Sequence, residues 1–394
     1  MLDATTWGTI ENAASQCATA KELTHPIYRY PARLSPYLAR AIIHATTKPG
    51  DLIMDPFCGG GTTAIEAIVS GRHIVASDMN PLACFVTLAK AYPIFEEEDK
   101  QAFLQWIREE EESWSSDIPF DEQMQSIVQN SSLLDLEIVQ RLFHLREKIG
   151  NLKNPSAKRL ALLTVLRLGQ IYFDSSNQTN NNLQASFRRL ANYILSKVAQ
   201  YARISAEASQ SEPMQSALRV LEVDASRLGF VHIGDRTPRL VLTSPPYPNV
   251  HVLYNKWQIK GRGETNLPYA LLGIKDGSPP SFYTFAPRQR SRSDELYFKK
   301  LQEIWMNLRY LLGPQTIVAQ IVSFPNPIEQ LPKFRKTMNL AGFKEIQTAQ
   351  KKALPLITRQ VPNRQWYTRI SKSPTQAFEY MFFHRIDSNN AKSL

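Results

Sequence analysis

A short apolar strand, a turn with three adjacent glycines, a helix and a second apolar strand follow one another within residues 52–78. The first strand ends on Asp55, the glycines occupy positions 59–61, and the second strand ends on Asp78. Strands that alternate with helices form a parallel sheet covered by those helices, and ligands bind at the carboxyl ends of its strands. This unit therefore predicts an α/β fold with a ligand site near Asp55 and Asp78.

Strand and helix signals return after a long helical stretch. Residues 93–215 contain only two glycines, and apolar residues recur there at helical spacing, interrupted by a polar loop at 174–187. We expect 93–215 to be a helical insertion inside one catalytic domain made of 1–92 and 216–394. Further strands are expected at 218–223, 240–242, 316–322, 343–348 and 378–384, and further helices at 36–46, 297–312 and 332–340.

The charge balance favours a polyanionic partner. The 394 residues include 46 Lys and Arg against 36 Asp and Glu, a formal net charge of +10, and such an excess is common in proteins that bind nucleic acid. No apolar run approaches the roughly 20 residues that span a bilayer. The first residues also lack the basic start and apolar core of a signal peptide, so we expect a cytoplasmic protein with no membrane partner.

The glycine turn suits a nucleoside that carries a positive charge. Glycines let the backbone approach a ligand closely, and the helix start after them offers unpaired N–H groups. A Walker phosphate loop needs Lys-Ser/Thr after its last glycine, where this chain has Thr62 and Thr63. The run also fits the dinucleotide pattern G-x-G-x-x-G/A, but Asp55 beside it would repel a pyrophosphate. S-adenosylmethionine fits better, with Asp78 accepting hydrogen bonds from both ribose hydroxyls.

A second motif, TSPPY at 243–247, follows the strand expected at 240–242. Its two prolines cannot donate hydrogen bonds to a sheet, and each restricts the residue before it. The chain must therefore leave the sheet there in a stiff, extended form. In a doubly wound sheet this motif and the glycine turn both lie at the carboxyl ends of strands, where ligands bind.

Together the motifs resemble those of the amino-group DNA methyltransferases. DPFCGGGTT at 55–63 is similar to the family's cofactor motif D-P-F-x-G-x-G-T, TSPPY is similar to its catalytic motif [DNS]-P-P-[YFW], and RYPARLSPYLAR at 29–40 resembles the F/Y-P-A-x-x-x-P segment that covers the cofactor. The resemblance covers 25–90 and 218–385. It implies a Rossmann-like methyltransferase sheet, mostly parallel with an antiparallel last strand, and S-adenosylmethionine as cofactor. The cofactor-binding residues that we expect are Tyr30, Pro31, Asp55, Pro56, Phe57, Gly59, Gly61, Thr62, Thr63, Asp78, Asn80 and Asp224.

The resemblance also implies how TSPPY acts. In this family the exocyclic amino group of a base attacks the sulfonium methyl directly, so the enzyme must hold the amino hydrogens and the base. We expect Ser244 and the Pro245 carbonyl to accept the amino hydrogens, with Pro246 keeping the segment rigid. Tyr247 is expected to stack on a base that has been flipped out of the duplex.

Serine at the first position of the catalytic motif resembles the cytosine-N4 branch. We therefore expect methylation of cytosine N4 in a specific duplex sequence, with adenine N6 as the nearest alternative. RNA guanine-N2 methyltransferases share a D-P-x-C-G-x-G-T motif and an [ND]-P-P-Y motif, and a non-catalytic DNA-binding protein that keeps the fold is a further alternative. The three cysteines have neither the setting of a cytosine-C5 nucleophile nor a CxxC pair, so we expect neither covalent chemistry nor a metal.

Two basic stretches that contain aromatic residues are candidates for contact with double-stranded DNA. The DNA-binding residues that we expect are Arg288, Arg290, Arg292, Arg359, Arg364, Trp366 and Arg369. The insertion at 93–215 lies between the two motifs and is the expected target-recognition region. The chain has no nuclease signature, so a cognate restriction endonuclease would be a separate protein. The sequence leaves the recognition site and the oligomeric state open.

Overall fold

A central mixed sheet organises the part of the chain that the structure describes. The structure is a computed structural model, and it describes residues 3–16, 21–31, 33–114, 124, 133–174, 182–208, 217–248, 256–259, 263–274, 285, 293–346, 357–361 and 377–387. The strand order is β3-β2-β1-β4-β7-β10-β8, and β9 also pairs with β10. The strands are β1 (Leu52–Asp55), β2 (His73–Asp78), β3 (Leu218–Glu222), β4 (Leu240–Thr243), β7 (Ile317–Val322), β8 (Phe343–Glu345), β9 (Ile357–Val361) and β10 (Ala377–Ile386).

The directions of these strands confirm the predicted fold class. Strands β3, β2, β1, β4 and β7 run parallel to one another, whereas β10, the last strand, is antiparallel to β7, β8 and β9. The fold is therefore α/β and Rossmann-like. Helices cover both faces of the sheet because apolar residues alternate along its strands: Ile53 packs with one cluster of buried residues, and Met54 packs with another.

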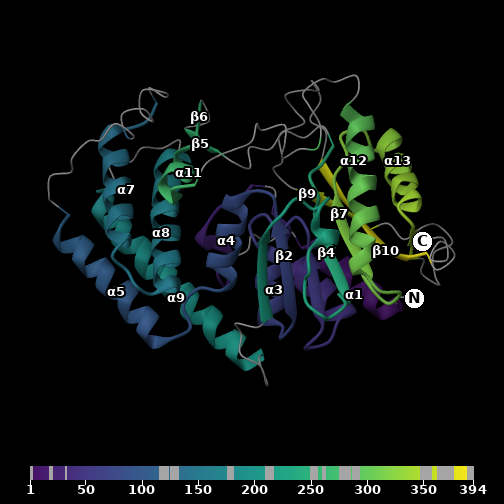
Figure 1. The fold of residues 1–394 in the computed structure, drawn as a ribbon, viewed down its shortest axis with the longest axis horizontal. Helices are drawn as coiled ribbons and strands as arrows, with labels where there is room; N and C mark the ends of the chain where they lie inside the picture. The colour runs from purple at the N-terminus through teal and green to yellow at the C-terminus, as the bar shows by residue number, and fades with distance from the viewer. Residues whose placement is uncertain are drawn as a thin grey trace.

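Two groups of helices form these two layers. The first group is α1 (Ala4–Ser15), α2 (Pro36–Thr46) and α3 (Thr62–Val69), and the second is α12 (Ser293–Leu308) and α13 (Pro327–Leu340). Figure 1 shows α12 and α13 on the right of the sheet and α4 (Pro81–Ala91) on its left. Helices α1 and α4 were not predicted from the sequence. Helix α13 begins five residues before Pro332, where its start was predicted because a proline within a helix looks like a helix start.

A separate helical array lies beside α4 (Figure 1). It contains α5 (Glu97–Glu112), α7 (Leu136–Ile149), α8 (Pro155–Asp174) and α9 (Leu183–Ala208), which share a third core. The strands β5 (Trp257–Ile259) and β6 (Gly263–Thr265) and the helix α11 (Leu267–Leu272) also contribute to that core. The helical character expected within 93–215 is therefore present, while the division of the chain into two domains stays a prediction.

Two expected loops contain regular structure. The helix α9 begins at Leu183, inside the stretch expected to be a loop to residue 187, because the Asn182 side chain accepts hydrogen bonds from the backbone N–H groups of Gln184 and Ala185 and so caps the helix. The basic stretch between the last two expected strands contains β9, which pairs with β10. In the described residues, no helix is both long and apolar enough to cross a membrane.

Candidate functional site

The two motifs meet where strands β1 and β4 end side by side. These strands pair in parallel, with Met54 opposite Val241. Just beyond this pair, the Thr243 hydroxyl donates a hydrogen bond of 2.6 Å to Asp55 Oδ1. Phe57 N donates to the same carboxylate oxygen at 3.2 Å. One aspartate therefore ties the start of the glycine turn to the start of the TSPPY segment.

Backbone conformation and close packing against Tyr30 make glycine necessary in the turn. Gly59 and Gly61 have positive φ values of +49° and +76°, which L side chains rarely adopt. Gly60 is constrained by space instead, because a Cβ atom there would lie 2.7 Å from the Tyr30 Cβ. Lys90 Nζ donates a hydrogen bond of 2.6 Å to the Gly60 carbonyl from the buried side of the turn. The backbone of the turn thus packs directly between a tyrosine and a lysine.

We expect Gly60→Ala to lower the free energy of unfolding by about 1–3 kcal/mol, because an added methyl group would overlap Tyr30. Gly8→Ala is the matched control: Gly8 lies in helix α1, and a Cβ there would meet nothing within 4 Å. That change should stabilise the protein by about 0.5–1 kcal/mol. Chemical denaturation of both variants measures the difference. Equal effects would contradict the close packing of Tyr30 on the turn.

Asp78 and Asn80 connect the turn to Tyr30. The Asp78 carboxylate accepts hydrogen bonds from Gly59 N at 3.0 Å and from Asn80 N at 2.9 Å. The Asn80 amide nitrogen donates to the Tyr30 hydroxyl at 3.1 Å, and its amide oxygen accepts from the Tyr269 hydroxyl at 2.6 Å. The end of strand β2 therefore orders both the glycine turn and the aromatic ring that packs on it.

Burial shifts the pKa of both aspartates in the same direction. Desolvation raises the pKa of Asp55 to about 6, against the opposing effect of hydrogen bonds from Thr243 and Phe57. Desolvation likewise raises the pKa of Asp78 to about 6, and the negative charge of Asp55 contributes to this rise. Two neighbouring carboxylates that are costly to ionise would be stabilised by a ligand with a positive charge or with hydroxyl donors.

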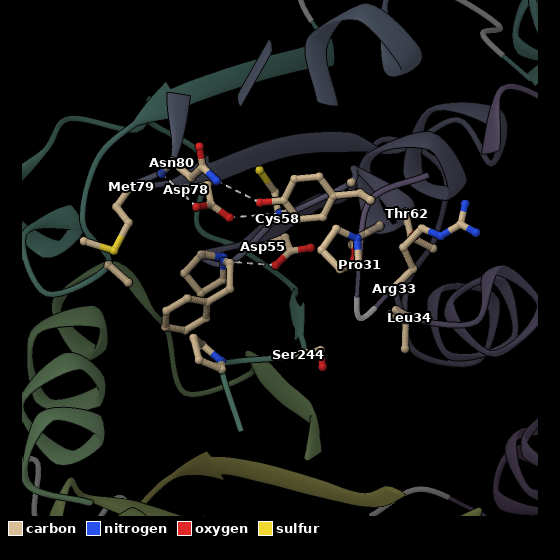
Figure 2. A pocket seen from close by; sticks show the side chains of 18 of the residues that line it. Pro31, Arg33, Leu34, Asp55, Cys58, Thr62, Asp78, Met79, Asn80 and Ser244 are labelled. Carbon is tan, nitrogen blue, oxygen red and sulfur yellow. Dashed lines mark hydrogen bonds between the residues drawn. The ribbon is translucent and has the colours of Figure 1, made fainter. Parts of the chain in front are cut away.

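These groups open into one pocket (Figure 2) with an empty volume of about 800 Å³, counting space that opens to solvent. In the view of Figure 2, Asp55 lies between Asp78 and Ser244. Of the twelve residues expected to bind a cofactor, all but Gly61 line the pocket, and Gly61 caps helix α3 instead. These eleven lining residues are Tyr30, Pro31, Asp55, Pro56, Phe57, Gly59, Thr62, Thr63, Asp78, Asn80 and Asp224.

The TSPPY segment contributes Ser244 and Pro246 to the same pocket, whereas Pro245 and Tyr247 do not line it. Ser244 Oγ donates to the Ile321 carbonyl at 3.0 Å and lies 3.1 Å from the Tyr247 hydroxyl. The Tyr247 side chain packs in the core, where the residue is only 5% exposed. The expected stacking of Tyr247 on a base stays a prediction, and the ring is a buried support in this structure.

Arg359 is the one expected DNA-binding residue that the structure describes. Its side chain is 12% exposed and lies 4.0 Å from Glu379, so it points into the protein rather than forming part of an exposed basic face. The other six expected DNA-binding residues lie outside the described residues. They are Arg288, Arg290, Arg292, Arg364, Trp366 and Arg369.

Sequence reasoning missed several residues of this site. Gly60, Cys58 and Met79 adjoin expected residues in the chain and could have been included on that ground. Other members are Arg33, Leu34, Ala225 and Phe285, which also line the pocket. No sequence signal links Phe285 to the glycine turn, because only the fold brings a residue so distant in the chain against the Phe57 ring, at 5.6 Å between centroids.

Comparison with known proteins supports the interpretation of this pocket as a methyltransferase site. Residues 6–88 match the profile of a family of N6 and N4 methyltransferases described as DNA methylase. A type II methyltransferase from Kocuria varians is 40% identical over 77 residues, which are 19% of this chain and 17% of that protein. A tRNA (guanine(10)-N2)-dimethyltransferase from Methanothermobacter thermautotrophicus is 44% identical over 52 residues, which are 13% of this chain and 16% of that protein.

The family profile covers only the cofactor half of the site, because residues 6–88 include the glycine turn and Asp78 but not TSPPY. This chain spans less than a fifth of the length of either relative, so neither match extends to the rest of those proteins. A solved structure of an rRNA methyltransferase from Streptomyces viridochromogenes aligns with 97% of this chain and 93% of its own, at 14% identity. Its TM-score of 0.28 is too low to support an argument about this fold.

Proposed function

We propose that this chain, a member of the family of amino-group methyltransferases, transfers a methyl group from S-adenosylmethionine to the N4 amino group of cytosine in a specific duplex sequence. The observation that carries this proposal is the hydrogen bond between Thr243 and Asp55. It joins the two motif-bearing strand ends at one pocket, which Ser244 and Asp78 both line. A methyl donor and a target amino group could therefore be held side by side.

The family match implies S-adenosylmethionine as the methyl donor, and the pocket fits it. When bound, this cofactor supplies a methyl group on a positively charged sulfur. Asp55 and Asp78, whose ionised forms are disfavoured by burial, would gain a cationic neighbour and hydroxyl donors. The Gly59–Gly61 turn would bring the backbone against the ligand, and Tyr30, tied to Asn80, would cover it.

The affinity for S-adenosylmethionine is expected to fall as the pH drops from 7 to 5. Asp55 and Asp78 have pKa values of about 6, so protonation in this range removes the charges that attract a sulfonium ion. The loss should be about tenfold for each carboxylate that must be ionised. Titration calorimetry at pH 7, 6 and 5 measures it. S-adenosylhomocysteine, which lacks the sulfonium charge, should lose less affinity, and an equal loss for both ligands would contradict this role.

The choice of cytosine N4 depends on Ser244. A hydroxyl beside the pocket can accept a hydrogen bond from an amino group, and serine at this position resembles the cytosine-N4 branch. Adenine N6 is the nearest alternative, because it is also an exocyclic amino group and would need the same arrangement. Base flipping into the pocket, with Tyr247 beside the base, is part of the proposal.

Expression in a bacterial host without DNA methylation, followed by long-read sequencing that detects modified bases, tests the proposal. A single sequence motif that carries N4-methylcytosine is the expected result. Detection of N6-methyladenine would support methyl transfer to an amino group of DNA but show that the target base is adenine and not cytosine. Unmodified DNA from a folded protein that binds the cofactor would overturn DNA as the substrate.

Methylation of a guanine amino group in RNA is a second candidate. The similarity to a tRNA (guanine(10)-N2)-dimethyltransferase over 52 residues favours it. Incubation with total RNA and labelled cofactor, followed by nucleoside mass spectrometry, would detect N2-methylguanosine. We prefer double-stranded DNA because the family profile is described as DNA methylase. A cytoplasmic location, and a cognate restriction endonuclease as a separate protein, are further parts of the DNA proposal.

A further inference from the structure

A chain of hydrogen bonds leads from the pocket wall into the protein. Ser244 Oγ lies 3.1 Å from the Tyr247 hydroxyl, which lies 3.1 Å from Glu379 Oε1. Arg359 Nη1 lies 4.0 Å from Oε2, the other carboxylate oxygen of Glu379. Of these four residues only Ser244 lines the pocket. The chain therefore begins at the pocket and ends in the interior.

The sheet fixes the interior end of this series of hydrogen bonds. Glu379 of β10 stands directly opposite Arg359 of β9 in antiparallel register, which puts the two side chains on the same face of the sheet. The Glu379 side chain is 4% exposed. A carboxylate removed from water needs opposite charge and hydrogen bonds, and here Arg359 supplies the charge while Tyr247 supplies a hydrogen bond. A buried carboxyl group is thus held two hydrogen bonds from Ser244.

Methyl transfer to an amino group leaves one proton to be removed. When the nitrogen forms its bond to the methyl carbon, the S–C bond breaks and its electron pair stays on sulfur. The nitrogen then carries a positive charge and one proton too many. A carboxylate can keep such a proton, whereas the neutral hydroxyl of Ser244 can only pass it on.

We propose that Glu379 is a positioning residue for the target amino group and the final acceptor of its proton. The proton of the nitrogen passes to Ser244 Oγ, the hydroxyl proton of Ser244 passes to the Tyr247 oxygen, and that of Tyr247 passes to Glu379. The two hydroxyl groups end as they began, and Glu379 becomes neutral until it releases the proton to solvent. Tyr247 donates to Glu379. The single hydroxyl proton of Ser244 can be donated either to the Ile321 carbonyl or to the Tyr247 oxygen, and the transfer uses the hydrogen bond to Tyr247.

This inference rests on the proposed methyl transfer, but not on which base is methylated. Its test measures the steady-state kinetics of labelled methyl transfer to unmethylated bacterial genomic DNA and to total RNA. Glu379→Gln keeps an oxygen for the Tyr247 hydroxyl but cannot take up a proton. We expect it to lower kcat by about 30-fold, less than the 100-fold or more lost with a group that touches the substrate. The KM values and the cofactor Kd from calorimetry should stay within about twofold.

Three further variants separate a proton acceptor from a structural role. Glu379→Asp keeps a carboxylate and should recover kcat to within about fivefold of wild type. Tyr247→Phe breaks the chain while leaving the Glu379–Arg359 pair in place, and should match Glu379→Gln. The double variant should be no slower than either single variant, because both remove the same path.

Glu345→Gln is the matched control. Glu345 lies on β8, which also pairs with β10, and forms an ion pair of 2.9 Å with Arg335 outside the pocket. It should keep wild-type kcat. Three results would each overturn this inference while leaving the proposed function in place. They are a wild-type kcat in Glu379→Gln, an equal loss of kcat in Glu345→Gln, and additive losses in the double variant. A wild-type protein that transfers no methyl to DNA or RNA would overturn the proposed function and this inference with it.

Discussion

Ser244→Ala is expected to reduce single-turnover methyl transfer by about 100- to 1,000-fold while the Kd for S-adenosylmethionine stays within about twofold. Ser244 Oγ lines the pocket at the end of strand β4 and is held by the Ile321 carbonyl and the Tyr247 hydroxyl. Removing one preoriented hydrogen-bonding group from a reacting centre has effects of this size. Rapid-quench kinetics with labelled cofactor measure the transfer, and calorimetry measures the binding.

Ser323→Ala is the control for this experiment. Ser323 follows strand β7, beside β4, and its hydroxyl also bonds a backbone carbonyl, that of Phe378, at 2.7 Å. It does not line the pocket, so the change should cost stability without reducing transfer specifically. If Ser244→Ala weakened cofactor binding as much as it slowed transfer, the division of the pocket into a cofactor part and a target part would be wrong.

Asp78→Ala, in contrast to Ser244→Ala, is expected to affect mainly cofactor binding, with a Kd for S-adenosylmethionine about 100-fold higher than in wild type. The carboxylate holds Gly59 N and Asn80 N, and it lines the pocket. The change removes these two hydrogen bonds together with the proposed bonds to the cofactor ribose. Hydrogen bonds to a charged group contribute about 1.5–3 kcal/mol each, and a 100-fold change corresponds to about 2.7 kcal/mol. Calorimetry measures the affinity directly.

Two comparisons sharpen this second prediction. Asp78→Asn keeps one oxygen acceptor and should fall between wild type and Asp78→Ala. Asp235 is exposed and does not line the pocket, so Asp235→Ala should bind the cofactor as wild type does. At saturating cofactor, the transfer rate of Asp78→Ala should recover to within about tenfold of wild type, since the target groups around Ser244 are unchanged. A Kd within threefold of wild type would contradict the role of Asp78.

Local sequence was sufficient for the parts of the site that are continuous in the chain. The residues 52–78 contain both strands, the turn and both aspartates, and the structure has β1 and β2 as expected. Backbone requirements made this possible, because a turn with positive φ at Gly59 and Gly61 leaves little choice of residue. The two prolines of TSPPY likewise ended strand β4 where expected.

Where the sequence analysis differed from the structure, long-range packing decided the outcome. The helix α13 continues through Pro332, because Phe334 and Met338 are buried in the core beyond it. The hydroxyl of Tyr247 bonds Glu379 and its ring is buried, which no local pattern predicted, and its stacking on a base stays a prediction. Strand pairing sets Arg359 opposite Glu379, which no local pattern predicted, and its contact with DNA stays a prediction.

The fold class, the glycine turn and the two motifs of the proposed chemistry could be predicted from local sequence, since these depend on backbone conformation and on neighbouring residues. The distant groups that reach the site could be identified only from the packing of the whole fold. Glu379 reaches Tyr247, and Phe285 reaches Phe57, across long stretches of chain. Strand order and register set those contacts, and both result from burying many side chains at once rather than from any local pattern.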